Sequence, residues 1–304
     1  MVVADGGWPG LVLKIAIGDI RKSNGSPARQ AFEVGAGVDW DEFVMRSVAE
    51  KCAGVECLSG IPGTAGGTPV QNVGAYGQEV SETITSVRVC EIATERILDL
   101  EREQCGFSYR TSIFNSTQRG RYIVLRVNFS LSPGGTPSIQ YGDLKRFFAD
   151  RRTPPSLLET RDAVREIRRS KAMLIVPGED DCRSAGSFFK NPVVNSELAE
   201  KISAWAGARK LQLPQYPSGD GGIKLPAAWL VEQAGFSKGY TKGPVGISRK
   251  HSLAIVNRGG ATAQDILGLG TEIQGRVAEI FGLELHREPV LVGFDLDRPG
   301  PGES

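Results

Sequence analysis

Alternation of apolar and polar residues predicts strands in several parts of the chain. Between residues 122 and 131 the apolar side chains fall on one face and the polar ones on the other, which is the period of a half-buried strand. The apolar face would hold Ile123, Leu125, Val127, Phe129 and Leu131, and the polar face Arg126, Asn128 and Ser130. Further strands are predicted over residues 2–4, 10–17, 84–92, 96–100, 252–257 and 290–293.

Helical spacing of apolar residues appears between these strands. Residues 40–48 place Trp40, Phe43 and Val44 on one helical face, and Asp39 or Asp41 is positioned to cap that helix. Together with an irregular, glycine-rich stretch over 58–77, this predicts a mixed α+β protein with a domain boundary near residues 172–180. Further helices are predicted from Pro154 to about Ser170, near 196–206, from Pro226 to Gly235, and over 266–280.

Composition and charge narrow the class of protein. In 304 residues, 36 Lys and Arg against 35 Asp and Glu give a formal charge of +1, which argues against a nucleic acid or a membrane surface as partner. No apolar run is long enough to span a bilayer and the first residues lack the layout of a signal peptide, so a cytoplasmic location is expected. Five cysteines without a CxxC pair and only two histidines favour free thiols and no metal centre.

Residues 59–77 carry the first candidate chemistry. Six of these nineteen residues are glycine, which lets the main chain approach a ligand closely and expose its N–H groups. Such a segment can wrap a diphosphate or a flavin ring, yet it has neither the GxGxxG spacing of a dinucleotide fold nor a GxxxxGK[ST] phosphate loop. From the residues alone, a structural glycine-rich loop is an equally good interpretation.

Three further residues each have an ordinary interpretation beside a functional one. Arg110, flanked by aromatic and apolar residues, can grip a carboxylate bidentately or serve as a structural ion-pair partner. Ser187 lies between Gly186 and two phenylalanines, but no nucleophile elbow surrounds it and both histidines are distant in sequence, so an inert serine is the simpler interpretation. Glu288, just before the terminal strand, is by itself an ordinary edge charge.

In this order and spacing, the segments resemble the UDP-N-acetylenolpyruvoylglucosamine reductase family. These flavoenzymes, also called UDP-N-acetylmuramate dehydrogenases, make the muramate sugar of bacterial peptidoglycan. The loop at residues 141–144 and the loop around Tyr216 resemble the branch of the family with an extra tyrosine loop over the substrate. The resemblance covers nearly the whole chain and is carried by residues 59–77, 109–114, 141–144, 186–192 and 224–230, and by Glu288.

The resemblance implies an α+β fold with two domains. An FAD-binding domain of the vanillyl-alcohol-oxidase/PCMH type would occupy residues 1–176, and a smaller α+β substrate-binding domain residues 177–284. Residues 285–304 would form a terminal strand that returns to the FAD domain, followed by a disordered tail. Members of the family begin with a further FAD-binding subdomain that this sequence lacks. We therefore expect an N-terminally incomplete FAD domain and a native start upstream of Met1.

The implied reaction is the reduction of UDP-N-acetylglucosamine-enolpyruvate to UDP-N-acetylmuramate by NADPH through bound FAD. Hydride added to the vinyl carbon drives negative charge toward the carboxylate, and a proton must then reach the adjoining carbon. By resemblance, Arg110 would hold the carboxylate, Ser187 would donate the proton, and a protonated Glu288 would support the intermediate.

The resemblance also implies which residues contact the ligands, and no metal ligand is among them. The FAD contacts would be Gly60, Ile61, Pro62, Gly63, Thr64, Gly66, Gly67, Gln71, Asn72, Gly74 and Ala75. The UDP-sugar or the nicotinamide phosphate would contact Tyr141, Lys171, Asn191, Tyr216, Lys238 and His251.

Two other functions stay open at this point. One is a related flavoprotein oxidase of the same fold acting on another sugar, which reactivity with oxygen would reveal. The other is a truncated, non-catalytic nucleotide-sugar binding protein, which would bind a UDP-sugar without flavin. A monomer is expected. A covalent flavin link is not, because residues 59–77 contain no His or Cys.

Overall fold

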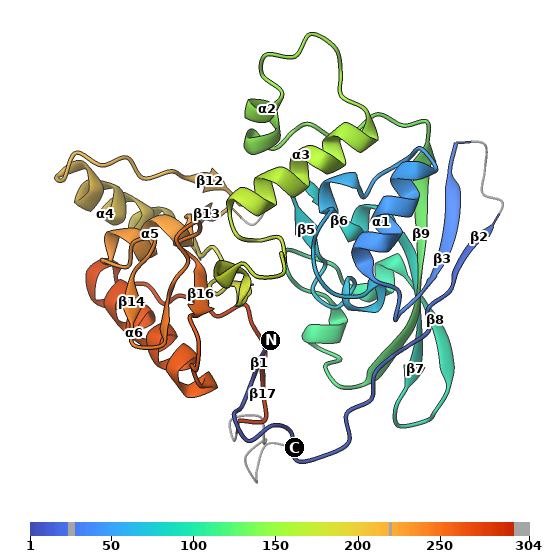
Figure 1. The fold of residues 1–304 in the computed structure, drawn as a ribbon, viewed down its shortest axis with the longest axis horizontal. Helices are drawn as coiled ribbons and strands as arrows, with labels where there is room; N and C mark the ends of the chain where they lie inside the picture. The colour runs from blue at the N-terminus through green and yellow to red at the C-terminus, as the bar shows by residue number, and fades with distance from the viewer. Residues whose placement is uncertain (24–27, 219–220, 295–304) are drawn as a thin grey trace. The chain divides into compact units, whose positions relative to one another are not determined.

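The computed structural model describes residues 1–23, 28–218 and 221–294, and the chain divides into two compact units (Figure 1). The central unit is Leu13–Ser170, and the terminal unit combines Met1–Val12 with Lys171–Ser304. Both units contain helices and strands, as the predicted α+β class requires. The tail that was predicted to be disordered lies outside the described residues.

The central unit is built on one antiparallel sheet. Its strands are β2 (Ile20–Ser23), β3 (Gln30–Gly35), β9 (Tyr122–Pro133), β7 (Ile84–Glu91) and β8 (Ile97–Glu101), in that spatial order. The short strand β4 (Cys52–Ala53) pairs with the end of β9, and β5 (Gly74–Ala75) and β6 (Gln78–Glu79) form a separate hairpin. The helices are α1 (Trp40–Ala49), α2 (Gly142–Phe147) and α3 (Leu157–Ser170).

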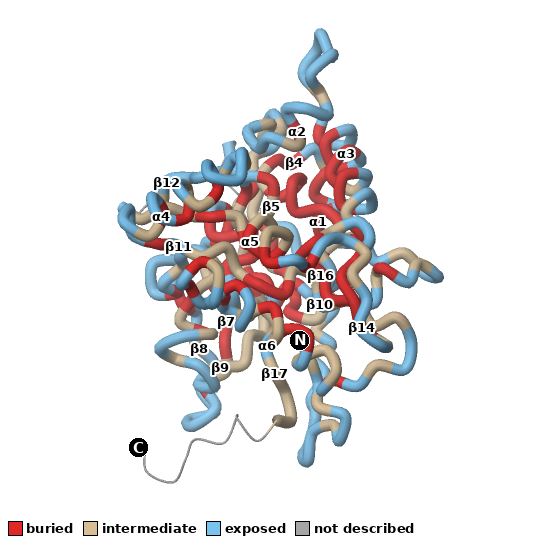
Figure 2. Tube along the Cα trace, turned by 90° about the vertical axis from the view of Figure 1, so that its left-hand side faces the viewer, coloured by how far each residue is buried: buried red, intermediate tan, exposed pale blue. Residues whose placement is uncertain are grey.

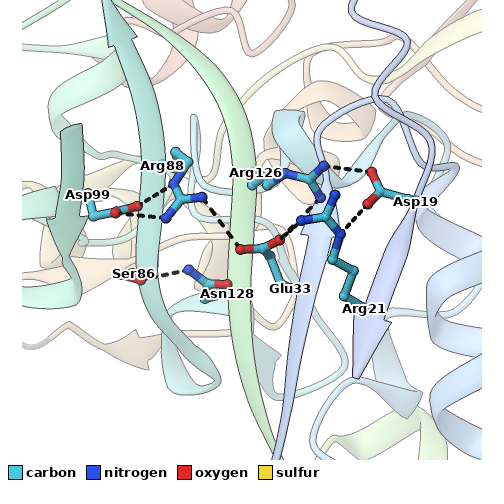
Figure 3. Close-up of polar contacts among 8 residues, drawn as sticks. All are labelled: Asp19, Arg21, Glu33, Ser86, Arg88, Asp99, Arg126 and Asn128. Atoms are coloured by element: carbon cyan, nitrogen blue, oxygen red, sulfur yellow. Dashed lines mark hydrogen bonds and ion pairs between the residues drawn. The ribbon is translucent and has the colours of Figure 1, made fainter. Parts of the chain in front are cut away.

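The two faces of this sheet have opposite character, and residues 126–131 alternate as predicted. The pairing register shifts between Arg88 and Val89, and beyond that point Tyr122 and Val124 pack against the core, where the prediction had placed Ile123 and Leu125. On the core face, Val127, Phe129 and Leu131 are buried, and the Phe129 ring lies 4.9 Å from that of Phe43 in α1. On the other face, charged side chains from successive strands pair across the sheet (Figure 3). The ion pairs there include Arg21–Asp19, Arg21–Glu33, Arg126–Asp19, Arg126–Glu33, Arg88–Glu33 and Arg88–Asp99.

Among its described residues, the terminal unit has three small sheets and three α-helices. Strand β1 (Val2–Val3) pairs in parallel with β17 (Leu291–Val292). The four-stranded sheet has the order β10 (Ser184–Ser187), β16 (Ala254–Asn257), β15 (Val245–Ile247) and β14 (Thr241–Lys242). The three-stranded sheet has the order β11 (Val193–Val194), β13 (Ile223–Lys224) and β12 (Tyr216–Pro217). The helices are α4 (Ser196–Gly207), α5 (Ala227–Gln233) and α6 (Ala263–Phe281).

Most predicted elements are confirmed, but the predicted strand over residues 10–17 is wrong. Leu11 is 82% exposed, and the stretch is irregular until β2 begins at Ile20. Two isolated backbone bonds hold the chain beside β3, from Gly37 N–H to the Ile17 carbonyl and from Gly35 N–H to the Asp19 carbonyl. Apolar alternation is a local signal, whereas a strand also needs a continuous partner.

Buried side chains form two hydrophobic clusters in the central unit and one in the terminal unit. No described helix is long and apolar enough to cross a bilayer. Buried positions (red in Figure 2) recur along α1 and α3 in the central unit and along α6 in the terminal unit. All five cysteines are free, as predicted.

Candidate functional site

The first part of the glycine-rich segment, residues 60–65, forms a turn whose middle is exposed and whose two ends are anchored. At its start, Gly60 has a φ of +72° and donates its N–H to Asp41 Oδ1 at 2.6 Å. Beyond the turn, the N–H of Ala65 donates to the Val38 carbonyl at 2.8 Å, which closes the second end. Between these anchors, residues 62–64 are exposed and form what we call the crest.

The predicted FAD contacts divide into an exposed and a buried set. A Cβ added at Gly63 or Gly67 would meet nothing within 4 Å, so the main chain at both positions is open to a ligand. The φ of +120° at Gly63 is a backbone conformation that side-chain-bearing residues rarely adopt. The segment therefore fits a flat or diphosphate ligand lying against its backbone. Pro62, Gly63, Thr64, Gly67 and Gln71 are exposed, Ile61 and Ala75 are half-buried, and Gly60, Gly66, Asn72 and Gly74 are buried.

Substitution by alanine is expected to destabilise the fold at Gly66 but not at the adjacent Gly67. A Cβ at Gly66 would lie 2.4 Å from Ala36 Cβ and 2.9 Å from Ala36 Cα, so Gly66→Ala should destabilise the fold by about 1–3 kcal/mol through overpacking. Gly67→Ala is the matched control, because its Cβ has open space. Urea unfolding of both variants checks this, and equal stabilities would contradict it.

Asn72 fixes the far end of the segment through its side chain. Its amide nitrogen donates to Glu79 Oε2 at 2.8 Å and to the Ser108 carbonyl at 3.0 Å, and its amide oxygen accepts the N–H of Ser81 at 3.2 Å. Its φ of +44° is one of several left-handed values among non-glycine residues here, and Tyr76 and Arg110 share this conformation. Such backbone costs about 1–2 kcal/mol per residue, and it concentrates at functional sites.

Arg110 lies beside the end of the glycine-rich segment. The residues on either side of the Tyr109–Arg110 pair, Ser108 and Thr111, bond each other through both N–H groups, which makes a tight turn. The Arg110 guanidinium donates from Nη2 to the Gly74 carbonyl at 2.7 Å and lies 5.3 Å from the centroid of the Tyr109 ring. The structure thus brings the predicted carboxylate-binding residue together with a predicted cofactor-binding one.

Tyr141 is the remaining predicted ligand contact of the central unit. It precedes α2, is 47% exposed, and meets the ring of Tyr76 edge-on with 5.5 Å between centroids. Burial raises the pKa of Tyr76 to about 12, and Tyr76 also hydrogen-bonds to the buried Arg168. Tyr141 therefore lies at the same end of the glycine-rich segment as Gly77.

Ser187 ends β10 in the terminal unit, between two other segments. It pairs with Ala254 of β16, and the next residue, Phe188, donates its N–H to the Leu253 carbonyl at 2.8 Å. On the other side, the N–H of Glu288 donates to the Phe188 carbonyl at 3.0 Å. The backbone thus places Ser187 and Glu288, both half-buried, on neighbouring segments.

His251 lies just before β16, the strand that pairs with Ser187. Its Nδ1 accepts the N–H of Leu253 at 2.9 Å, which leaves Nε2 as the protonated nitrogen of the neutral ring. Burial, with smaller contributions from the charges of Lys171 and Lys238, lowers the pKa of His251 to about 4. Three of the predicted substrate contacts are therefore electrostatically coupled within this unit.

His251 is expected to stay neutral throughout the neutral pH range. Because an unfolded histidine titrates near 6.5, the unfolded chain binds more protons between pH 6.5 and 4, and the free energy of unfolding falls as pH drops through that window. In the wild type this titration should lower the free energy of unfolding by about 3 kcal/mol between pH 6.5 and 4, and the His251→Gln variant should lack that decrease. An NMR titration of the two histidines checks the pKa, and a His251 midpoint near 6.5 would contradict it.

Asn191 and Tyr216 lie near the start of α5 and on β12. The Asn191 side chain accepts the N–H of Ala227 at 2.9 Å, so it braces the first turn of α5. Tyr216 is 56% exposed and pairs with Lys224 of β13. An exposed tyrosine opposite a lysine is suited to an anionic ligand.

Two carboxylates near these sites, Asp181 and Asp41, were not predicted from the sequence as site residues. Buried Asp181 accepts hydrogen bonds from the Ser248 hydroxyl at 3.1 Å and the Arg249 N–H at 3.0 Å, and Ser248 Oγ accepts the N–H of His251. Asp41 binds Arg161 of α3 through both carboxylate oxygens. The capping choice left open by the sequence falls to Asp39, which accepts the N–H of Glu42. The one sequence feature that could have pointed to the Asp41–Arg161 contact is the helical spacing of the arginines in α3.

Comparison with known proteins gives two family matches that together cover most of the chain. Residues 4–101 match the family described as "FAD binding domain", and residues 177–292 match "UDP-N-acetylenolpyruvoylglucosamine reductase, C-terminal domain". These matches confirm the predicted α+β fold with an FAD-binding domain and a second domain after it.

Curated relatives and a solved structure agree with these matches. The UDP-N-acetylenolpyruvoylglucosamine reductase of Thermobifida fusca is 45% identical over 97% of this chain and 84% of its own length. Those of Streptomyces coelicolor (42%, covering 97% and 77%) and Mycobacterium tuberculosis (43%, covering 85% and 72%) are similar as well. The crystal structure of the reductase from Thermus caldophilus aligns with a TM-score of 0.56 at 25% identity, covering 86% of this chain and 72% of that one.

Proposed function

The chain belongs to the UDP-N-acetylenolpyruvoylglucosamine reductase family, and we propose on that basis how its own side chains carry out the family's reaction. It is an oxidoreductase that uses FAD and NADPH to reduce the enolpyruvyl group of a UDP-linked sugar in peptidoglycan synthesis. The observation that carries this function is 45% identity to such a reductase over 97% of the chain.

The glycine-rich segment of the central unit would hold the flavin. FAD, when bound, supplies the hydride-transfer chemistry that protein side chains lack. The exposed crest and the open backbone at Gly63 and Gly67 give a surface on which no side chain blocks close approach. Buried Gly60 and Gly74 would act by setting the course of the loop.

Arg110 would bind the carboxylate of the enolpyruvyl group. Its hydrogen bond to Gly74 and its position over the Tyr109 ring restrict the guanidinium before substrate arrives. A cation that is already oriented stabilises charge developing on the carboxylate without a reorganisation cost during the reaction. Asn115 supports the arrangement by donating to the Arg110 carbonyl at 3.1 Å.

Ser187 would deliver a proton from Oγ to the carbon next to the carboxylate. Its place at the end of β10 fixes the backbone on both sides, through β16 and through the segment that carries Glu288. A protonated Glu288 would support the enolate-like intermediate by donating to its oxygen. General acid catalysis by a positioned group contributes about 10²–10⁴-fold.

The remaining predicted contacts would hold the UDP-sugar or the nicotinamide phosphate. Lys171 and Lys238 supply positive charge beside neutral His251, whose Nε2–H is available as a donor. Tyr141, Asn191 and Tyr216 complete the proposed set. With the function we also propose a monomer in the cytoplasm, a location that accords with five free cysteines.

An anaerobic spectroscopic titration of the full chain tests the function. The purified protein should show the visible absorbance of bound flavin, NADPH should bleach it, and UDP-N-acetylglucosamine-enolpyruvate should restore it. A folded chain without flavin would contradict the assignment, as would a reduced protein that the UDP-sugar leaves bleached. Rapid restoration by oxygen alone would instead indicate an oxidase.

A further inference from the structure

One carboxylate of the central unit joins three elements next to the crest. Asp41, in the first turn of α1, accepts two hydrogen bonds from Arg161 of α3, at 2.6 and 2.8 Å, and one from Arg165 at 2.5 Å. The same carboxylate accepts the N–H of Gly60 at 2.6 Å. Arg161 and Gly60 are buried and Asp41 is half-buried, so the contact is partly shielded from solvent.

Helix α3 also binds the opposite side of the Gly60 peptide unit. Arg161, Arg165 and Arg168 follow one another at helical spacing, so they share one face of α3. Arg168 donates from Nε to the Gly60 carbonyl at 3.2 Å and hydrogen-bonds to Tyr76 near the far end of the glycine-rich segment. Gly60 is thereby held through its N–H by Asp41 and through its carbonyl by Arg168.

The charge of Asp41 is stable in this setting. Partial burial alone would raise the pKa of its carboxyl, but the hydrogen bonds from Arg161 and the Gly60 N–H and the charges of Arg161 and Arg165 outweigh it, and the pKa is lowered. A charged, bidentate pair is both stronger and more directional than a neutral hydrogen bond. The acceptor presented to Gly60 is therefore an oriented carboxylate.

The crest follows Gly60 by two residues. Gly60 holds a left-handed φ of +72°, so its peptide sets the direction in which the chain enters the exposed residues 62–64. The crest itself is bonded to the start of α1, where the Trp40 N–H donates to the Gly63 carbonyl at 3.0 Å. On the far side, Val38 and Ala36 fix the chain by backbone bonds to Ala65 and Gly66, and these bonds do not depend on any side chain. The near anchor depends on two charged side chains, those of Asp41 and Arg168, and of the two only Asp41 accepts the Gly60 N–H.

We propose that Asp41, oriented by Arg161, is a positioning residue that sets the crest for binding the flavin. This inference rests on the proposed function, since the ligand is FAD. Asp41 acts through Gly60 and needs no contact with the cofactor. The competing account is that the Asp41–Arg161 pair only ties α1 to α3 and stabilises the fold.

FAD titration of the apoprotein, followed by flavin fluorescence, separates the two accounts. Asp41→Ala removes the acceptor of the Gly60 N–H and should raise the FAD dissociation constant about tenfold or more. Asp41→Asn keeps a neutral acceptor and should raise it less. Asp99→Ala is the matched control and should leave the FAD dissociation constant unchanged. Asp99 also makes a bidentate pair with an arginine, Arg88, at 2.9 and 3.0 Å, but on the polar face of the central unit's sheet (Figure 3).

The inference is overturned if Asp41→Ala, folded at the temperature of the titration, binds FAD as tightly as the Asp99→Ala control. Should Asp41→Ala fail to fold, Arg161→Lys decides in the same assay, since it keeps the charge but loses the bidentate geometry. Weaker FAD binding by Arg161→Lys supports positioning, and unchanged binding overturns it. A folded wild-type chain that takes up no FAD would instead overturn the proposed function, and this inference with it.

Discussion

Ser187→Ala is expected to block reduction of the sugar while leaving reduction of the flavin by NADPH intact. Only the second half of the reaction needs a proton at the carbon next to the carboxylate, and alanine has no proton to give. The sugar-dependent rate should fall by about 10²–10⁴-fold, the contribution of a positioned general acid. Stopped-flow absorbance measures both half-reactions on one preparation.

Ser184→Ala provides the control for this experiment. Ser184 lies on the same strand as Ser187 and pairs with Val256 of β16, so its loss tests any general effect of shortening a β10 side chain. Both half-reactions should proceed at wild-type rates in that variant. Ser187→Cys, which restores an acidic hydrogen, should recover part of the lost rate. Equal rates for Ser187→Ala and the wild type would remove Ser187 from the mechanism.

Helices and long strands were predictable because their signals are local. The spacing of Trp40, Phe43 and Val44 defined α1, and alternation along residues 122–131 defined the interior of β9. The strand predicted over residues 10–17 failed for the opposite reason. Its alternation was genuine, but strand pairing depends on distant residues. At its end the segment makes an isolated backbone bond from the Ile17 carbonyl to the Gly37 N–H.

The site shows the same division between local and distant information. The glycine content of residues 59–77 identified the segment, but not that the backbone at 62–64 is exposed while Gly60 and Gly66 are buried. The left-handed backbone of Arg110 has no counterpart in residue type, because arginine does not favour it. Asp41 and Arg161 are 120 residues apart, and no sequence motif around either residue indicates that they pair.

Arg110→Gln is expected to lower kcat/KM for the UDP-sugar by about 10²–10³-fold, the loss associated with one preorganised donor at a developing negative charge. Glutamine is no worse suited than arginine to the φ of +55° at this position, so the substitution adds no backbone strain. It does remove the bond to the Gly74 carbonyl, and that bond supports the proposed flavin segment. The FAD dissociation constant must therefore be measured alongside the sugar kinetics.

Arg121→Gln distinguishes loss of the carboxylate ligand from loss of an arginine packed on an aromatic ring. Arg121 lies 5.1 Å from the centroid of Tyr122, much as Arg110 lies 5.3 Å from that of Tyr109. If the Arg110 guanidinium binds the enolpyruvyl carboxylate, Arg110→Gln should slow the sugar half-reaction strongly and nearly preserve FAD affinity, whereas Arg121→Gln should leave both unchanged. If Arg110→Gln instead weakens FAD binding while bound flavin still passes hydride to the sugar at the normal rate, the guanidinium acts through Gly74, and the carboxylate must be held by another cation.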